Sequence, residues 1–370
     1  MVWLLLPLCS VLFLGLSMGC AEAGGSNPHP PVAQIKIQSV TFDAVRRPSP
    51  GALEHLRDMG VTHLTLISFG WQAGHDVPEV QLHNEARWFS EGDAGIRSLA
   101  HEADSLGLSI ILKPHIWVRM EGEEGLARHR IAFDTEEKWR QWEDHYHRFM
   151  MHYAHLAQEI DAPVLVIGTE LANPVRTRPD FFRHLIADIR NVYDGKLTYA
   201  ANWWEDYEHV SFWDALDYIG VQAYFELSKA NNPTLDLLKT GWEAPEAALQ
   251  QLSKETGKPV LFTEIGYRNI SYAAAQPWRW PERDEEAPQD DALQARLYEA
   301  FFASLWHEPW FAGAILWKWR PPMEDPEHDR RRRRPGTYLG FTPQDKPAEQ
   351  VIARWFTGQA FRGQEAATSQ

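Results

Sequence analysis

The sequence predicts a single α/β domain, a (β/α)8 TIM barrel, because β-rich runs and amphipathic helical patterns alternate along most of the chain. Eight runs have strand character, and helical patterns separate most of them. A chain of 370 residues, 44% of them hydrophobic, can bury the large core that such a barrel requires. No glycine-rich phosphate loop follows any of the runs, which disfavours an open doubly wound sheet.

The expected strands are the runs in which β-branched and other apolar residues cluster. They cover residues 35–43, 61–69, 108–116, 162–170, 196–204, 216–224, 258–267 and 311–319. The expected helices cover residues 49–59, 92–106, 136–160, 179–192, 244–256 and 291–307. The first of these helices has proline near its start and Gly60 at its end, which are typical helix boundaries.

The N-terminus resembles an export signal. Residues 4–18 are apolar but too short to span a membrane comfortably, and small residues follow them. The stretch "LSMGC" is similar to a bacterial lipoprotein signal, which would make residues 1–19 the signal peptide and Cys20 the lipidated residue. Plain secretion and a retained anchor are the alternatives. The expected organisation is then a flexible spacer at 20–34, a (β/α)8 domain at 35–360 and a disordered tail at 361–370.

The composition narrows the classes of molecule that the protein is expected to bind. The formal charge of −15 disfavours nucleic acid and anionic membrane surfaces, so we expect membrane contact only through an N-terminal lipid anchor. The 17 Trp are a large number for this length, and their flat faces suit the C–H faces of sugar rings. The expected location is extracytoplasmic, either anchored as a lipoprotein or secreted or periplasmic. No cysteine remains beyond Cys20 after cleavage, so we expect no disulfide.

In barrels of this kind the active site lies at the C-terminal ends of the strands. The expected strand ends bring together carboxylates, a lysine, a histidine, an amide and several aromatic rings, a set that core packing does not require. These residues are Asp43, Phe69, Trp71, Lys113, His115, Glu170, Asn202, Trp203, Tyr224, Glu264, Trp317 and Trp319.

Glu170 and Glu264 end the fourth and seventh expected strands, on opposite sides of the barrel mouth. Glycoside hydrolysis uses two carboxyl groups, about 5–5.5 Å apart when one is a nucleophile and about 6.5–9.5 Å apart when water lies between them. We expect the shorter distance here. Each carboxylate is expected to raise the proton affinity of the other, so that one stays protonated as an acid. The alternative is that each glutamate forms a structural salt bridge.

The motifs "GTEL", "LKPHI", "LTYAANW", "VLFTEIGY" and "ILWKW" together resemble glycoside hydrolase family 113, a β-mannanase group in the clan of retaining (β/α)8 glycosidases. The resemblance covers nearly all of 35–360 and includes the tail "GFTPQDKPAEQVIARWF". It implies that Glu170 is the acid/base and Glu264 the nucleophile. Many clan members have Asn before the acid/base; this chain has Thr169, and family 113 is similar in this departure.

Several further residues are expected to bind the sugar. Lys113 and His115 are predicted to lie on one face of a strand and to contact sugar hydroxyls; an ion pair and a buried core histidine are the alternatives. The resemblance implies that Tyr224 donates to the nucleophile and that Trp317 forms a platform under the sugar. Trp319 is either core or a second wall.

The loop from Arg268 to Asp291 is long and contains Trp278 and Trp280, which favours a wall of the substrate site. Trp71, Asn202 and Trp203 complete the expected substrate-binding set. The sequon at Asn269 is interpreted as chance, because a glycan there would obstruct the mouth.

The predicted function is a retaining β-glycoside hydrolase, an endo-β-1,4-mannanase that acts on mannan or glucomannan polysaccharides or oligosaccharides. No metal or organic cofactor is implied. One alternative is the same chemistry on xylan or a β-glucan. The other is a non-catalytic glycan-binding surface lipoprotein, which would have no need of two facing carboxylates. The histidines at 145, 147, 152 and 155 are interpreted as part of a mixed helix face, and the arginines at 330–334 as a solvated loop.

Overall fold

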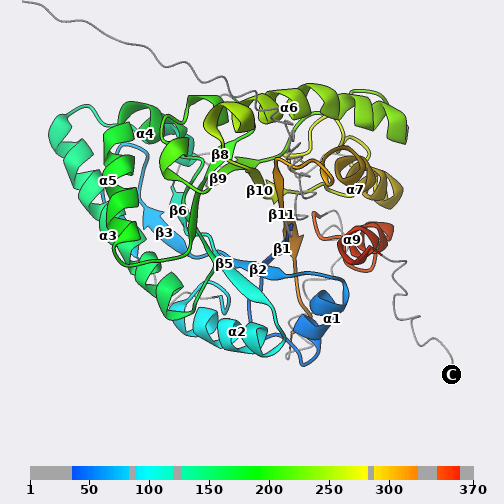
Figure 1. Ribbon diagram of the computed structural model, residues 1–370, viewed down its shortest axis with the longest axis horizontal. Helices are drawn as coiled ribbons and strands as arrows, with labels where there is room; N and C mark the ends of the chain where they lie inside the picture. Colours follow the sequence, from blue (N-terminus) through cyan, green and yellow to red (C-terminus); the bar gives the residue numbers. More distant parts are fainter. Residues whose placement is uncertain are drawn as a thin grey trace, which may run out of the picture. The chain divides into compact units, whose positions relative to one another are not determined.

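The computed structural model describes residues 36–82, 88–119, 127–204, 206–281, 287–323 and 340–358. Eight parallel strands close into a barrel in the order β1-β11-β10-β9-β8-β7-β5-β2, which confirms the predicted fold class (Figure 1). The barrel strands are β1 (Ile37–Phe42), β2 (His63–Leu66), β5 (Ser109–Leu112), β7 (Val164–Thr169), β8 (Lys196–Asn202), β9 (Tyr218–Gln222), β10 (Val260–Ile265) and β11 (Phe311–Trp319).

Helices follow the strands and cover the outside of the barrel (Figure 1). They are α1 (Ala52–Asp58), α2 (Asp93–Ser105), α3 (Glu136–Glu159), α4 (Ala172–Thr177), α5 (Pro179–Arg190), α6 (Leu235–Thr256), α7 (Asp291–Leu305) and α9 (Pro347–Thr357). Among the loop residues that the structure describes, short 3-10 turns occur at η1 (Ala127–Arg130), η2 (Tyr207–His209) and η3 (Trp213–Ala215).

The two-residue period of the strands divides the core into two layers. Aliphatic side chains fill the barrel lumen: Ile37, Ile111, Val164, Val166, Ala200, Leu261, Ala312 and Ile315. A larger cluster packs between the strands and the helices. Within it α3 buries Trp142, Tyr146 and Phe149 along one face. Its histidines lie elsewhere: His147 contacts Asp188 at 2.9 Å and His152 contacts Asp93 at 3.0 Å.

Two predicted strands are too long. The runs at 61–69 and 108–116 each break after the barrel strand, and their ends join a separate sheet of β4 (Val80–Leu82), β3 (Phe69–Gln72) and β6 (His115–Val118). Pro114 has no N–H to donate to the strand ladder, which accounts for the break after β5. The apolar pattern continues across the break between β2 and β3, so periodicity did not reveal it.

One helix is longer than predicted. Helix α6 begins at Leu235 rather than at residue 244, and Pro245 lies in its interior. Proline favours the first turn of a helix and disfavours the interior, so it suggested a start that the structure does not have. The true start is marked by Thr234, whose side chain accepts a hydrogen bond from the N–H of Leu237 at 3.3 Å.

The predictions for the N-terminal and C-terminal segments, including Cys20, fall outside the described residues. Among the helices that the structure does describe, none combines the length and apolar character needed to cross a membrane.

Candidate active site

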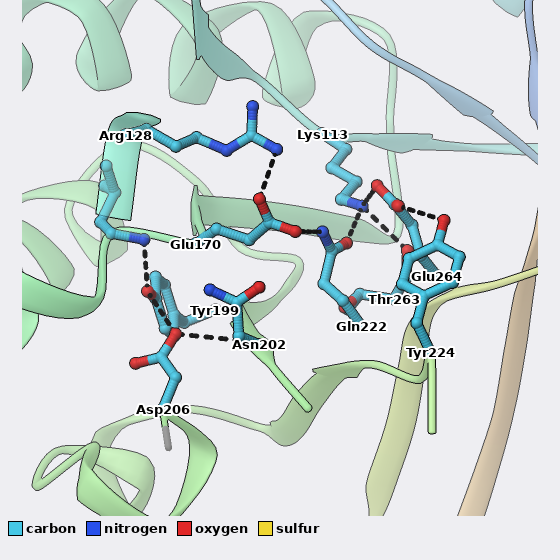
Figure 2. Close-up of polar contacts among 11 residues, drawn as sticks. Lys113, Arg128, Glu170, Tyr199, Asn202, Asp206, Gln222, Tyr224, Thr263 and Glu264 are labelled. Atoms are coloured by element: carbon cyan, nitrogen blue, oxygen red, sulfur yellow. Dashed lines mark hydrogen bonds and ion pairs between the residues drawn. The ribbon is translucent and has the colours of Figure 1, made fainter. Parts of the chain in front are cut away.

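The ends of four neighbouring strands carry the polar residues of the mouth. Strand register places Glu264 of β10 beside Gln222 of β9, and Gln222 beside Asn202 of β8. Glu170 follows the last residue of β7, and its N–H donates to the carbonyl oxygen of Ala200 on β8 at 2.8 Å. Parallel strands therefore bring side chains that are far apart in the sequence to one end of the barrel (Figure 2).

A chain of hydrogen bonds connects the two glutamates through Lys113, which follows β5 (Figure 2). Lys113 Nζ lies 2.5 Å from Glu264 Oε1 and 2.6 Å from Gln222 Oε1, and it also donates to the carbonyl oxygen of Thr263 at 2.9 Å. Gln222 Nε2 donates to Glu170 Oε1 at 2.6 Å. Both glutamates thus lie in one polar network at the barrel mouth.

The Glu264 carboxylate is held from two sides. Its second oxygen, Oε2, accepts a hydrogen bond from the Tyr224 hydroxyl at 2.8 Å. Burial raises the pKa of Tyr224 well above 10, and the negative charge of Glu264 raises it further, so Tyr224 stays protonated and donates. Burial lowers the pKa of Lys113, while the Glu264 charge opposes that shift. The carboxylate therefore has a fixed orientation and a neighbouring positive charge.

Glu170 is held by a residue that sequence reasoning missed. Arg128 Nη2, in η1, lies 2.7 Å from Glu170 Oε2. Burial raises the pKa of Glu170, but the Arg128 charge and the Gln222 hydrogen bond outweigh burial and leave that pKa below its usual range. The expectation that the second carboxylate would keep Glu170 protonated is therefore wrong for this arrangement, because a guanidinium contacts it directly.

Gln222 and Arg128 were both absent from the predicted site. Gln222 had a usable signal, because it lies two residues before Tyr224 in the same β-rich run and ends its strand. Arg128 lies in a short turn between strand and helix, and no periodic pattern marks it.

Aromatic rings form a wall beside Glu264. The Trp203 ring lies 5.5 Å from the Tyr224 ring and 6.5 Å from the Trp278 ring, measured between centroids. Trp278 is 43% exposed, and its indole N–H donates to Glu226 at 3.1 Å. The loop after β10 therefore brings Trp278 next to the mouth, where it presents an accessible face.

Trp280 lies farther along the same loop. The Arg268 guanidinium lies 4.3 Å from its ring centroid, and the Phe341 ring lies at 5.5 Å. Phe341 in turn lies 6.1 Å from Tyr224. Trp280 is thus connected to the Trp203–Trp278 wall through Phe341 rather than by direct stacking, and it remains 54% exposed.

His115 and Trp71 belong to the separate sheet and not to the ends of barrel strands. His115 of β6 is buried beside Phe69 of β3, and its Nε2 has no hydrogen-bond partner among the described residues. Burial, with the charges of Lys113 and Arg128, holds the pKa of His115 well below its usual value, so the ring is neutral. Trp71 of β3 is half-buried and lies opposite Trp117 of β6.

Trp317 is half-buried near the end of β11, and the Lys318 ammonium lies 5.1 Å from its ring centroid. Asp43, at the end of β1, accepts contacts from Lys318 at 2.6 Å and from Arg320 at 3.1 Å. Burial raises the pKa of Asp43, but these two cations outweigh it and lower that pKa. Trp319 is 3% exposed, so it is a core residue and not a second wall of the site.

The sequon asparagine is a structural residue. Asn269 is fully buried, donates through Nδ2 to Asp291 at 2.7 Å and accepts from the N–H of Gly340 at 2.9 Å. Its amide is already engaged, in agreement with the interpretation of this sequon as chance.

One buried and one partly buried carboxylate, with accessible aromatic faces at the C-terminal mouth of a (β/α)8 barrel, define a glycoside hydrolase. The model of Glycoside Hydrolase Family 113 matches residues 46–339, and the chain belongs to this family. The predicted family is therefore confirmed. No curated protein sequence matches the chain.

Solved structures agree with this assignment. A GH113 β-1,4-mannanase described as a complex is 26% identical, with 88% of this chain and 99% of that chain covered and a TM-score of 0.71. The GH113 β-mannanase AaManA from Alicyclobacillus acidocaldarius, in complex with ManMIm, is 29% identical, with coverage of 87% and 97% and a TM-score of 0.70. A third structure, also of a GH113 β-1,4-mannanase, is 25% identical, with coverage of 87% and 99% and a TM-score of 0.72.

Proposed function

We propose that this glycoside hydrolase is a retaining, endo-acting β-1,4-mannanase whose substrate is mannan or glucomannan. The observation that carries the proposal is the largely buried network in which Lys113 and Gln222 join Glu264 to Glu170. Membership of family 113 and the similarity to β-1,4-mannanase structures support the choice of substrate.

In the first step Glu264 attacks the anomeric carbon of the bound sugar, and the bond from that carbon to the glycosidic oxygen breaks. Glu170 gives its proton to the leaving oxygen, and a covalent glycosyl-enzyme forms on Glu264. Lys113 and Tyr224 suit this role, because both donate to the Glu264 carboxylate and hold it in a fixed orientation.

In the second step Glu170 takes a proton from water, the water oxygen attacks the anomeric carbon, and Glu264 leaves as a carboxylate. The Arg128 contact favours the ionised form of Glu170 that this step needs. For the first step Glu170 must hold a proton. A sugar that takes the place of the Arg128 contact would remove the largest influence that lowers the pKa of Glu170, while burial would still raise that pKa.

The surroundings of the carboxylates suit a neutral polysaccharide. The Trp203–Trp278 wall and Trp317 offer aromatic faces for sugar rings, and Asn202 and His115 offer polar groups. Trp204 extends this aromatic surface on the Glu170 side: it is 44% exposed, and its ring lies 5.8 Å from His129, the neighbour of Arg128.

A reducing-sugar assay on β-mannan, glucomannan, xylan and β-glucan tests the proposal, with Glu264→Gln as the inactive control. We expect release of reducing ends from mannan and glucomannan and a rapid fall in polymer viscosity, which marks endo action. Activity confined to xylan or β-glucan would overturn the substrate assignment. Binding without hydrolysis of any polymer would favour the non-catalytic glycan binder.

We also propose that the protein is exported and anchored through a lipid on Cys20. The support is the apolar segment at residues 4–18 and the "LSMGC" motif. A spacer at 20–34 would then let the barrel reach a polymer away from the membrane.

A further inference from the structure

The backbone at Glu170 has an unusual conformation. Its φ angle is 53°, in the left-handed region that residues with a side chain rarely adopt. Such a conformation persists only where the surrounding structure holds it, and it is common at functional sites. Here two hydrogen bonds flank the residue: the N–H of Glu170 donates to Ala200, and the N–H of Leu171 donates to the Tyr199 hydroxyl at 2.7 Å.

The Tyr199 hydroxyl is itself held by a buried carboxylate (Figure 2). It donates to Asp206 Oδ2 at 3.2 Å, and the same oxygen accepts the backbone N–H of Asn202 at 3.0 Å. Tyr199 is fully buried and Asp206 is 1% exposed. A single carboxylate oxygen therefore links the ends of β7 and β8, the strands that carry Glu170 and Asn202.

Tyr199 lies on the outer side of β8. Its neighbour Ala200 belongs to the lumen cluster, whereas Tyr199 packs in the outer core with ring contacts to Phe182 and Phe212 at 6.4 and 6.2 Å. The hydroxyl thus reaches the Glu170–Leu171 peptide from behind the strand. Removing the Tyr199 hydroxyl therefore changes no side chain that faces the barrel lumen.

We propose that Tyr199 and Asp206 are positioning residues that hold the Glu170–Leu171 peptide in its left-handed conformation and so aim the Glu170 carboxyl at the glycosidic oxygen. The inference rests on the proposed role of Glu170 as acid/base. A general acid must lie within hydrogen-bond reach of the atom that it protonates, so a rotated peptide would reduce proton transfer first.

The test is the dependence of kcat/KM on leaving-group ability, measured on aryl β-mannobiosides with leaving groups of increasing pKa. The ratio kcat/KM reports the steps up to formation of the glycosyl-enzyme. In these steps only poor leaving groups need the proton that Glu170 supplies. We expect Tyr199→Phe to lower kcat/KM by roughly 10- to 100-fold for poor leaving groups and to leave activated ones nearly unchanged.

Tyr193→Phe is the matched control. Tyr193 is also a buried tyrosine, and its hydroxyl donates to the carbonyl oxygen of Ala162, before the start of β7 and away from the mouth, at 2.6 Å. We expect Tyr193→Phe to have the same kcat/KM as the wild type for every leaving group. A uniform loss across all leaving groups in Tyr199→Phe, or no loss at all, would overturn the inference.

Asp206 gives a second, independent pair of variants. Burial raises the pKa of Asp206 to about 6, so an uncharged side chain that keeps an acceptor oxygen is a mild change. We expect Asp206→Asn to stay close to the wild type and Asp206→Ala to share the leaving-group dependence of Tyr199→Phe. Equal behaviour of the two Asp206 variants would contradict the proposal.

Glu170→Gln separates this inference from the proposed function. If Glu170→Gln loses activity selectively on poor leaving groups while Tyr199→Phe does not, the positioning role is wrong and the catalytic assignment stands. If Glu170→Gln itself shows no such selectivity, the assignment of the acid is wrong.

Discussion

Lys113 and Glu264 form a buried ion pair at the barrel mouth. The two charged atoms lie 2.5 Å apart, and the side chains are 0% and 6% exposed. Moving both charges out of water is costly, and further hydrogen bonds to Gln222, Thr263 and Tyr224 offset part of that cost. The pair is therefore interdependent, since loss of either charge leaves the other buried without its partner.

Lys113→Met should lower both stability and turnover. We expect the free energy of unfolding to fall by about 3–5 kcal/mol, because the Glu264 charge is left unpaired. Lys196→Met is the control: Lys196 is 60% exposed and pairs with Asp217, so its loss should cost under about 1 kcal/mol. Urea unfolding measures the stability of both variants. If Lys113→Met/Glu264→Gln is not less destabilised than the sum of the single variants, the pair is not coupled as described.

The two glutamates should respond differently to substitution. Glu264→Gln should abolish turnover on every substrate, since no nucleophile remains. Glu170→Gln should retain most activity in the first step where the leaving group needs no proton. Azide should restore turnover of Glu170→Ala by attacking the glycosyl-enzyme in place of activated water. Identical leaving-group profiles for the two variants would show that the roles are wrongly assigned.

Arg128→Gln should move the pH profile. The Arg128 charge lowers the pKa of Glu170, so its removal raises that pKa. Since the first step needs protonated Glu170, the alkaline limb of kcat/KM should move to higher pH. Arg130→Gln, an exposed position in the same 3-10 turn, should leave the limb in place. An unchanged limb, or one displaced to lower pH in Arg128→Gln, would show that Arg128 does not set the protonation of Glu170.

Trp278→Ala should weaken binding of long substrates. The exposed Trp278 face can stack on a sugar ring, and loss of stacking raises KM for polymers more than for short aryl glycosides. Trp310→Ala provides the comparison, because Trp310 immediately precedes β11 at the opposite end of the barrel. Equal KM changes on polymer and aryl glycoside would count against a role for Trp278 as a wall of the substrate site.

Cys20→Ser tests the proposed anchor. We expect the wild type to fractionate with membranes and to carry a lipid mass increase, because two or more acyl chains give stable attachment. The variant should lose the mass increase and either leave the membrane or remain an unprocessed precursor. A soluble wild-type product that begins after Cys20 would show plain secretion.

The sequence was most informative where strand geometry fixes position. A β-rich run that ends in Glu170, and another that ends in Glu264, were sufficient to place both at one mouth, because parallel barrel strands share their C-terminal ends. Tyr224 and Lys113 were placed at the mouth for the same reason. The hydrogen bond from Tyr224 to Glu264, which the family resemblance implied, is present, and Lys113 forms the ion pair that was the alternative to a sugar contact.

The sequence was less informative where position depends on loops. Arg128 reaches Glu170 from a turn that carries no periodic pattern, so neither this contact nor its effect on the pKa of Glu170 could be predicted. The separate sheet that carries Trp71 and His115 was missed because a strand pattern does not show which sheet its ends join. The hydrogen bond between Tyr199 and Asp206 was also missed, because the Tyr199 side chain lies in the outer core and not in the barrel lumen.

Trapping of the glycosyl-enzyme tests the central claim most directly. An aryl 2-deoxy-2-fluoro-β-mannobioside with an activated leaving group should react once and accumulate, because fluorine slows both steps and the leaving group restores the first. We predict that mass spectrometry of the digested protein finds the added glycosyl mass on Glu264. An adduct on another residue, or continued turnover of natural substrate with inversion at the anomeric carbon and no adduct, would contradict the account.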